Sequence, residues 1–178
     1  MKQRSIHIEN GDPLEKLMDI LDGKVFHVSL ISNWGKISKL GKIIPNNDNT
    51  YETTFGSSIN SYFKNKGCVS VFDYRNIHDE EAQKHIHKCW PTRPLLDGKG
   101  ITIFILKPET HTCLITWENW KNEDLRQMIV PYIEAGYPGA IPLDSIEEVI
   151  FVTMKEDQNS LASALRRAWQ KSEKELIG

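Results

Sequence analysis

The sequence has few cysteines, no excess of basic charge and no long apolar run. Its three cysteines, Cys68, Cys89 and Cys113, are odd in number and widely spaced, which argues against a disulfide framework. Lys and Arg number 22 against 24 Asp and Glu, so the basic excess typical of proteins that coat nucleic acid is absent. There is no apolar signal region at the start and no run of membrane-spanning length. We therefore expect a cytoplasmic protein in a reducing compartment, without a membrane partner.

Several catalytic and metal-binding signatures are also absent. The sequence contains no P-loop, no GxGxxG and no HExxH. His78, His85 and Cys89 share one stripe of a helix expected over 78–89, but no second ligand pair accompanies them. An exposed helix face carrying histidines accounts for this pattern better than zinc does, so we expect no metal.

What is present is the composition of one ordinary globular domain. Hydrophobic residues make up 39% and charged residues 26% of the 178 residues. We expect a single domain over 1–178, in which 1–23 form an N-terminal extension and helix and 157–178 a C-terminal helix. Strands are predicted at 25–31, 68–74, 101–106 and 149–154, with a weaker one at 112–117. Without strict βαβ alternation, these elements favour an α+β fold.

The stretch 25–46 reads as a strand, a turn and a short helix. Asn33 is a candidate cap for the helix, Ile37 and Leu40 are expected to face inward, and Gly41 suits the helix end. Alternation along the strand places His27 and Ser29 on the face opposite Phe26, Val28 and Leu30. Either this polar pair lines a cleft or it lies on a solvated face.

A second candidate is Glu134, which stands among apolar residues in a segment rich in Gly and Pro. We expect 131–142 to be irregular, and such loops often carry functional groups on a rigid scaffold. Partial desolvation would raise the pKa of this carboxyl group, whereas an exposed loop acid would keep its ordinary value. Glu147 and Glu148, which follow, are expected to be solvated.

Two stretches together resemble the ADP-ribosyltransferase-like superfamily. In that family a strand bearing H-x-[ST] precedes a short helix that ends in I-x-x-x-G-[LI]-x-P, and a glutamate stands late in the chain. The matching residues here are His27, Ser29, Ile37, Gly41, Ile43 (shifted by one), Pro45, Glu134, Ile141, Pro142 and Ile146. The resemblance implies a split, mostly antiparallel β core with flanking helices around a cleft for NAD.

The resemblance also implies roles for individual residues. His27 would hydrogen-bond a ribose of NAD, the backbone near Val28 and Ser29 would meet the nicotinamide amide, and Glu134 would be the catalytic glutamate. Candidates for the middle motif are Ser57, Phe72 and Tyr74. NAD would be a substrate, its ADP-ribose passing to an unknown acceptor or to water. Nucleic acid enters only as one conceivable acceptor, beside protein and small molecules.

The chain departs from the family at two points, and two alternatives stay open. No clean second motif is present, and Tyr132 stands where many members carry Glu or Gln two residues before the catalytic glutamate. His27 and His111 begin two H-x-x-hydrophobic stretches, as in two-histidine phosphoesterases, where histidines from facing strands act as acid and base. The third interpretation is a non-catalytic binding or interaction module on the same fold.

Overall fold

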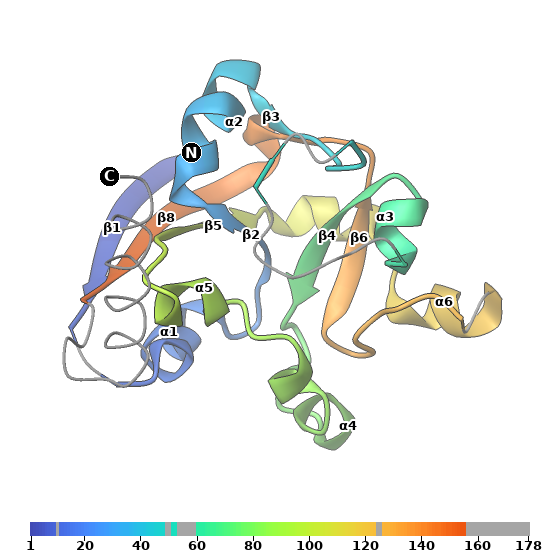
Figure 1. Ribbon diagram of the computed structural model, residues 1–178. Coiled ribbons are helices and arrows are strands. Elements are labelled where there is room, and N and C mark those ends of the chain that lie inside the picture. The colour runs from blue at the N-terminus through green and yellow to red at the C-terminus, as the bar shows by residue number, and fades with distance from the viewer. Residues whose placement is uncertain (10, 49–50, 53–59, 124–125, 156–178) are drawn as a thin grey trace, which may run out of the picture.

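The computed structural model describes residues 1–9, 11–48, 51–52, 60–123 and 126–155, and these form an α+β fold around one main sheet (Figure 1). The six strands lie in the order β1-β8-β5-β2-β4-β6. Their bounds are β1 (Lys2–Ile8), β2 (Val25–Leu30), β4 (Cys68–Asp73), β5 (Ile101–Leu106), β6 (Glu134–Pro138) and β8 (Ile146–Met154). All neighbours are antiparallel except β1 and β8. The expected α+β class with a mostly antiparallel sheet is confirmed.

Helices cover both faces of this sheet. One face carries α1 (Pro13–Leu21), α4 (Glu80–Gln83) and α5 (Arg93–Leu96), and the other carries α2 (Trp34–Leu40) with the small sheet of β3 (Lys42–Ile43) and β7 (Ile141–Pro142). At the β6 end lie α3 (Tyr62–Asn65) and α6 (Trp117–Glu123). Short 3-10 helices span Ile31–Asn33, Ile86–Lys88, Pro108–Cys113 and Leu143–Ser145. None of the described helices is long and apolar enough to cross a membrane.

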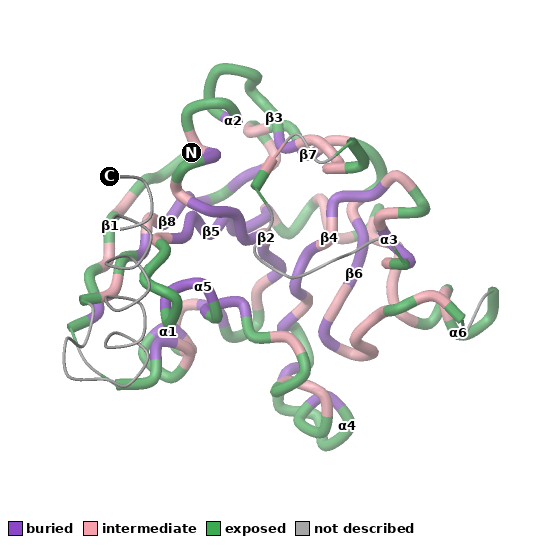
Figure 2. Tube along the Cα trace, in the orientation of Figure 1, coloured by how far each residue is buried: buried purple, intermediate pink, exposed green. Residues whose placement is uncertain are grey.

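The core follows the alternation of the strands. Every residue of β5 is buried, as expected for a central strand covered on both faces (Figure 2). Phe26 and Val28 of β2 pack with Leu17 and Leu21 of α1 on one face. On the other face Ile37 of α2 packs with a separate set of strand residues, Val69, Val71, Phe104, Val149 and their neighbours.

Local signals predicted the first helices well. Asp12 caps α1, accepting hydrogen bonds from the N–H groups of Leu14 (2.7 Å) and Glu15 (3.3 Å). Gly41, with φ of 72°, ends α2 as predicted. Two details of the prediction for α2 are wrong. Asn33 does not cap α2, and Leu40 is 47% exposed.

Other predictions failed where long-range contacts decide the structure. Residues 112–117 form the end of a 3-10 helix and the approach to α6 rather than a strand. The stretch 131–142, expected to be irregular, contributes β6 and β7. The single helix expected over 78–89 is α4 followed by a separate 3-10 helix. The C-terminal helix predicted for 157–178 lies outside the described residues.

The extended lead-in at the N-terminus is strand β1, which pairs with β8 over seven residues. Glu148 on β8 is only 9% exposed and accepts a hydrogen bond from Arg4 Nη2 at 3.1 Å. The expectation that this acid is solvated is therefore wrong. The ion pair joins β1 to the strand beside it.

Candidate functional site

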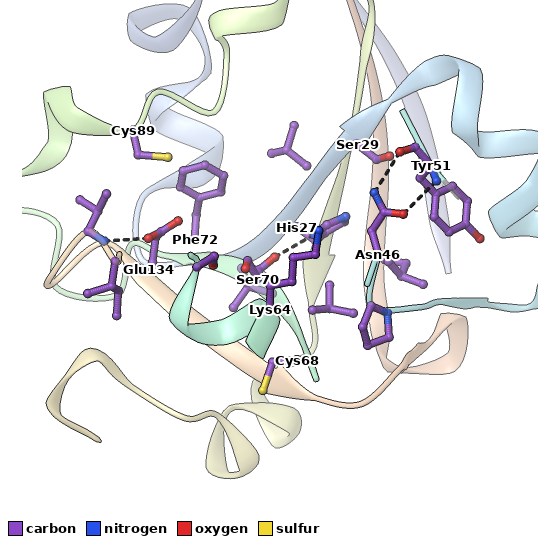
Figure 3. Close-up of a pocket in the computed structure, with 18 of the residues that line it drawn as sticks. His27, Ser29, Asn46, Tyr51, Lys64, Cys68, Ser70, Phe72, Cys89 and Glu134 are labelled. Carbon is purple, nitrogen blue, oxygen red and sulfur yellow. Dashed lines mark hydrogen bonds between the residues drawn. The ribbon is translucent and has the colours of Figure 1, made fainter. Parts of the chain in front are cut away.

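The central strands β2 and β4 separate, and a cavity of about 580 Å³ lies beside the point where they part (Figure 3). Their register holds only two pairs, Val25 with Asp73 and Phe26 with Phe72. On its other side, β2 pairs with β5 as far as Leu30. The backbone edge of β2 beyond Phe26 is thus not used by β4 within the described residues. The two strands therefore part after Phe26.

The split brings side chains from both faces of the sheet into one cavity. Phe26 and Phe72 are paired and stacked at 5.2 Å, so they share a face, and Glu134 opposite Phe72 shares it too. His27, the neighbour of Phe26, points to the other face. Both His27 and Glu134 nevertheless line the cavity, because it passes between the separated strands. A continuous sheet would have kept them apart.

His27 is fixed in one orientation by a bond across the split. Its Nδ1 lies 2.8 Å from the carbonyl oxygen of Ser70 on β4. A carbonyl only accepts, so Nδ1 carries the proton and Nε2 is left as an acceptor when the ring is neutral. Burial lowers the pKa of His27, and the bond to Ser70 opposes this effect to a smaller extent. Because the net shift is downward, the ring is neutral at pH 7.

Glu134 begins β6 and is bonded within its own turn. Its Oε2 accepts from the N–H of Val130 at 2.7 Å, and its own N–H donates to the Val130 carbonyl at 3.0 Å. Burial raises the pKa of the Glu134 carboxyl group, and the Val130 bond opposes this effect only in part. The desolvated acid anticipated from the sequence is therefore present, at the start of a strand rather than in an irregular loop.

The turn before Glu134 is held in an unusual conformation. Tyr132 has φ of 64°, the single positive φ at a non-glycine position among the described residues. Its ring lies against Trp117, with centroids 4.1 Å apart, and near His85. Tyr132 is not among the residues that line the cavity, and its ring packs on Trp117 instead.

The opposite end of the cavity is built by side-chain bonds to backbone. Asn46 brackets Tyr51, donating to its carbonyl and accepting from its N–H, both at 2.9 Å. Asn33 donates to Ser29 Oγ (3.0 Å) and to the Glu52 carbonyl (3.1 Å). These bonds position the Tyr51 ring at the end of the cavity far from Glu134 (Figure 3). They also explain why Asn33 does not cap α2.

The structure brings together most of the site residues predicted from sequence. His27, Val28, Ser29, Phe72 and Glu134 all line the cavity. Tyr74 does not: it lies just past β4, fully buried, with its ring edge-on to Phe26 at 4.9 Å. Ser57 lies outside the described residues.

Several lining residues were missed from sequence. Ile44, Asn46, Tyr51 and Lys64 come from loops and α3, and Lys64 points toward His27 (Figure 3). The stretch 87–90 with Arg93 forms another part of the wall, and its Cys89 lies near Glu134. The closely spaced basic and aromatic side chains of 87–93 were a usable signal. Nothing local marked Asn46 or Tyr51.

The predicted histidine stripe is dispersed. In the described ranges no group of three or more His, Cys, Asp or Glu side chains is arranged to hold a metal ion. His78 lies 3.0 Å from Asp22, whereas Cys89 faces the cavity. Burial, together with the nearby Glu134, raises the pKa of the Cys89 thiol to about 12, so it is not a thiolate nucleophile at neutral pH.

The chain matches no protein-family model, no curated protein and no solved structure. Its function is therefore inferred from its own residues. Chemically, the cavity offers a neutral imidazole acceptor, a partly buried and desolvated carboxyl group, an aromatic side chain beside each end and cationic groups along the wall.

Proposed function

We propose that this protein binds NAD between β2 and β4 and cleaves the bond between nicotinamide and ribose, passing ADP-ribose to an acceptor or to water. The observation that carries this proposal is the convergence of His27 and Glu134 on one cavity through the split in the sheet. This convergence supports the family resemblance. The two motifs that carry the resemblance place His27 and Glu134 more than a hundred positions apart in the sequence, and the sequence alone did not indicate that they meet.

The cavity suits a dinucleotide in size and in chemistry. Its volume of about 580 Å³ is within the range usual for small-molecule sites. Phe72 next to Glu134 offers a face to the nicotinamide ring, and Tyr51 at the far end offers one to adenine. Lys64, between the two, brings a positive charge to the diphosphate.

The roles of the two central residues follow from their electrostatics. The Nε2 lone pair of His27 accepts a hydrogen bond from a ribose hydroxyl. Glu134 stabilises the positive charge that develops at the ribose carbon as nicotinamide leaves with the electron pair of the broken bond. The carbon then bonds to an acceptor oxygen or nitrogen, and the acceptor's proton passes to Glu134 or water. A carboxylate in a dry pocket acts more strongly than one in solution.

The decisive experiment follows nicotinamide release from NAD by the purified protein. Glu134→Gln keeps the shape of the side chain and removes its charge, so release should fall by about a hundredfold or more. His111→Ala serves as the matched control, and its rate should stay close to that of the unaltered protein. Equal rates for Glu134→Gln and the unaltered protein would refute the proposal.

The phosphoesterase alternative requires two histidines on facing strands. His111 lies on the 3-10 helix Pro108–Cys113 and is not among the residues that line the cavity with His27. The pairing that this alternative needs is therefore not formed by these two residues. A loss of activity in His111→Ala as severe as in His27→Ala would restore it.

The binding-module alternative predicts occupancy without turnover. NAD bound to the folded state raises the melting temperature whether or not it is cleaved. A rise in melting temperature with no release of nicotinamide, in the presence of cell extract as a source of acceptors, would favour this alternative. No rise at saturating NAD would count against both.

A further inference from the structure

We infer that the acceptor is a single-stranded nucleic acid, held at the Glu134 end of the cavity by Trp90, Lys88 and Arg93. This inference rests on the proposed function, because it names the molecule that receives the ADP-ribose. It starts from the composition of the cavity rim, which a dinucleotide alone does not explain.

The segment 87–93 lines the cavity, and its Cys89 lies at the end where the reaction would occur. Cys89 is close enough to Glu134 for the carboxylate to affect its pKa, and Figure 3 shows both at the same end. Met128 is two residues before Val130, whose N–H bonds to Glu134. Both segments therefore line the cavity and each has a residue beside Glu134.

This rim exposes large apolar side chains. Trp90 is 36% and Met128 67% exposed, and both line the cavity. Single exposed hydrophobic side chains are common, but these two line the same cavity, and the indole of Trp90 offers a face to a flat ring. A nucleobase stacks on such a side chain whatever its sequence, because every base has a π face.

The same rim is cationic. Lys88 and Arg93 are both exposed, and neither forms an ion pair with a described residue. Lys88 Nζ lies 2.9 Å from His85 Nδ1, which leaves its charge uncompensated. Among the described lining residues, the acidic side chain besides Glu134 is Glu52, and Lys99 neutralises it at 2.7 Å.

Cations alternating with an aromatic platform match a strand whose phosphates alternate with bases. An acidic protein would supply carboxylates for ion pairs with Lys88 and Arg93, but it would supply no base to stack on the indole of Trp90. A duplex hides its base faces by stacking. Single-stranded DNA and RNA both present the phosphates and unstacked bases that the rim would bind. They differ in the ribose 2′-hydroxyl groups of RNA, so both are tested.

The transfer itself needs only NAD and the strand. The bond from the ribose carbon to the nicotinamide nitrogen breaks, and its electron pair leaves with nicotinamide. A base nitrogen or hydroxyl oxygen of the strand bonds to that carbon and loses its proton to Glu134 or to water. No oxidant or reductant takes part.

Binding is measured first, by fluorescence anisotropy of end-labelled single-stranded DNA and RNA oligonucleotides of mixed sequence with the full chain. Trp90→Ala should weaken binding by about fivefold or more, because stacking of one base is lost. Lys88→Gln and Arg93→Gln should each lower the slope of log affinity against log salt by about 0.7. The controls are Leu40→Ala and Lys39→Gln on α2, which do not line the cavity and should bind like the unaltered protein.

Transfer is measured next, with labelled NAD, the oligonucleotides and an acidic protein in parallel reactions. The inference predicts label on the single-stranded oligonucleotide and a reduced yield in Trp90→Ala. It is overturned if nicotinamide is released but the label goes to the acidic protein or only to water, or if the rim variants bind as well as the controls. No release of nicotinamide under any condition would instead overturn the proposed function, and this inference with it.

Discussion

At the scale of single residues, the side chain of His27 makes a hydrogen bond that replaces a missing backbone hydrogen bond between β2 and β4. It donates to the Ser70 carbonyl, which β2 no longer reaches with its backbone once the strands have parted. A histidine here both satisfies β4 and presents Nε2 to the cavity. Its neutrality follows from burial, which lowers its pKa.

Replacing His27 by Ala should affect stability and binding together. The Ser70 carbonyl loses its partner, at a cost of about 1–2 kcal/mol in the free energy of unfolding. The loss of Nε2 should also reduce the rise in melting temperature caused by NAD. The control is His7→Ala, because the hydrogen bond of this exposed side chain to a described residue is to Thr153, and its loss should cost about 0.5 kcal/mol or less. Unaltered NAD binding in His27→Ala would remove the residue from the site.

Glu134 should make the protein less stable as pH rises. Its pKa is raised in the folded state, so the folded chain binds more protons than the unfolded chain between the ordinary pKa of Glu, about 4.3, and the raised value. The stability it contributes is present below that window and is lost as pH rises through it. Glu134→Gln should therefore melt above the unaltered protein at pH 7, with a difference that shrinks toward pH 4. A Gln variant that melts lower at pH 7 would show that the carboxylate is not buried at a cost.

Alternation along a strand made the most accurate residue predictions. It placed His27 and Ser29 opposite Phe26, Val28 and Leu30; both polar residues line the cavity, whereas Phe26 and Val28 pack with α1, although Val28 lines the cavity as well. Tyr74, named with Phe72 for the middle motif, does share a face with it: both rings belong to one buried cluster, with centroids 6.0 Å apart. Tyr74 lies past the end of β4, fully buried, and is not among the residues that line the cavity, which the sequence pattern did not show.

At the scale of elements, β6 is positioned by close contact with α3. A Cβ added at Gly136 would meet the Phe63 ring and would lie 3.0 Å from Cys68 Cβ. Only glycine lets the strand approach so closely. This contact fixes how closely β6 approaches α3, and it therefore fixes the position of Glu134, the first residue of β6.

Gly136→Ala should cost about 1–3 kcal/mol of stability, because the new methyl group overpacks the contact with Phe63. It should also slow nicotinamide release, since β6 must shift. Gly35→Ala in α2 is the matched control. A Cβ there meets nothing within 4 Å, so the helix should gain up to about 1 kcal/mol. Equal melting temperatures for the two variants would contradict this account of β6.

The elements that local signals define could be predicted, and those that partners define could not. Asp12 with Pro13 and the αL glycine Gly41 marked their helix ends directly. By contrast, 134–138 reads EAGYP, which has little strand propensity, and it is a strand because β4 pairs with it over five residues. Residues 112–117 look like a strand, but in the described part of the chain their strand pairing is confined to one bridge, between Ile115 and Gly136 of β6.

At the scale of the whole molecule, the site exists because the sheet is incomplete. Pairing of β2 with β4 stops after two residues, although both strands continue, and the cavity lies between them. Which strands pair is decided by contacts far apart in the sequence, so no local pattern revealed the strand order or the parallel β1. Alternation along β2 did indicate that His27 and Ser29 share a side of the strand.

The central claim, that NAD occupies this split, is tested most directly by hydrogen–deuterium exchange on the Glu134→Gln protein, which should bind NAD without consuming it. The account predicts that saturating NAD slows amide exchange in β2, in β4 and in the turn 130–134. Exchange in β1 and α1 should stay unchanged. Slowed exchange confined to other elements, or no change anywhere at saturating NAD, would contradict it.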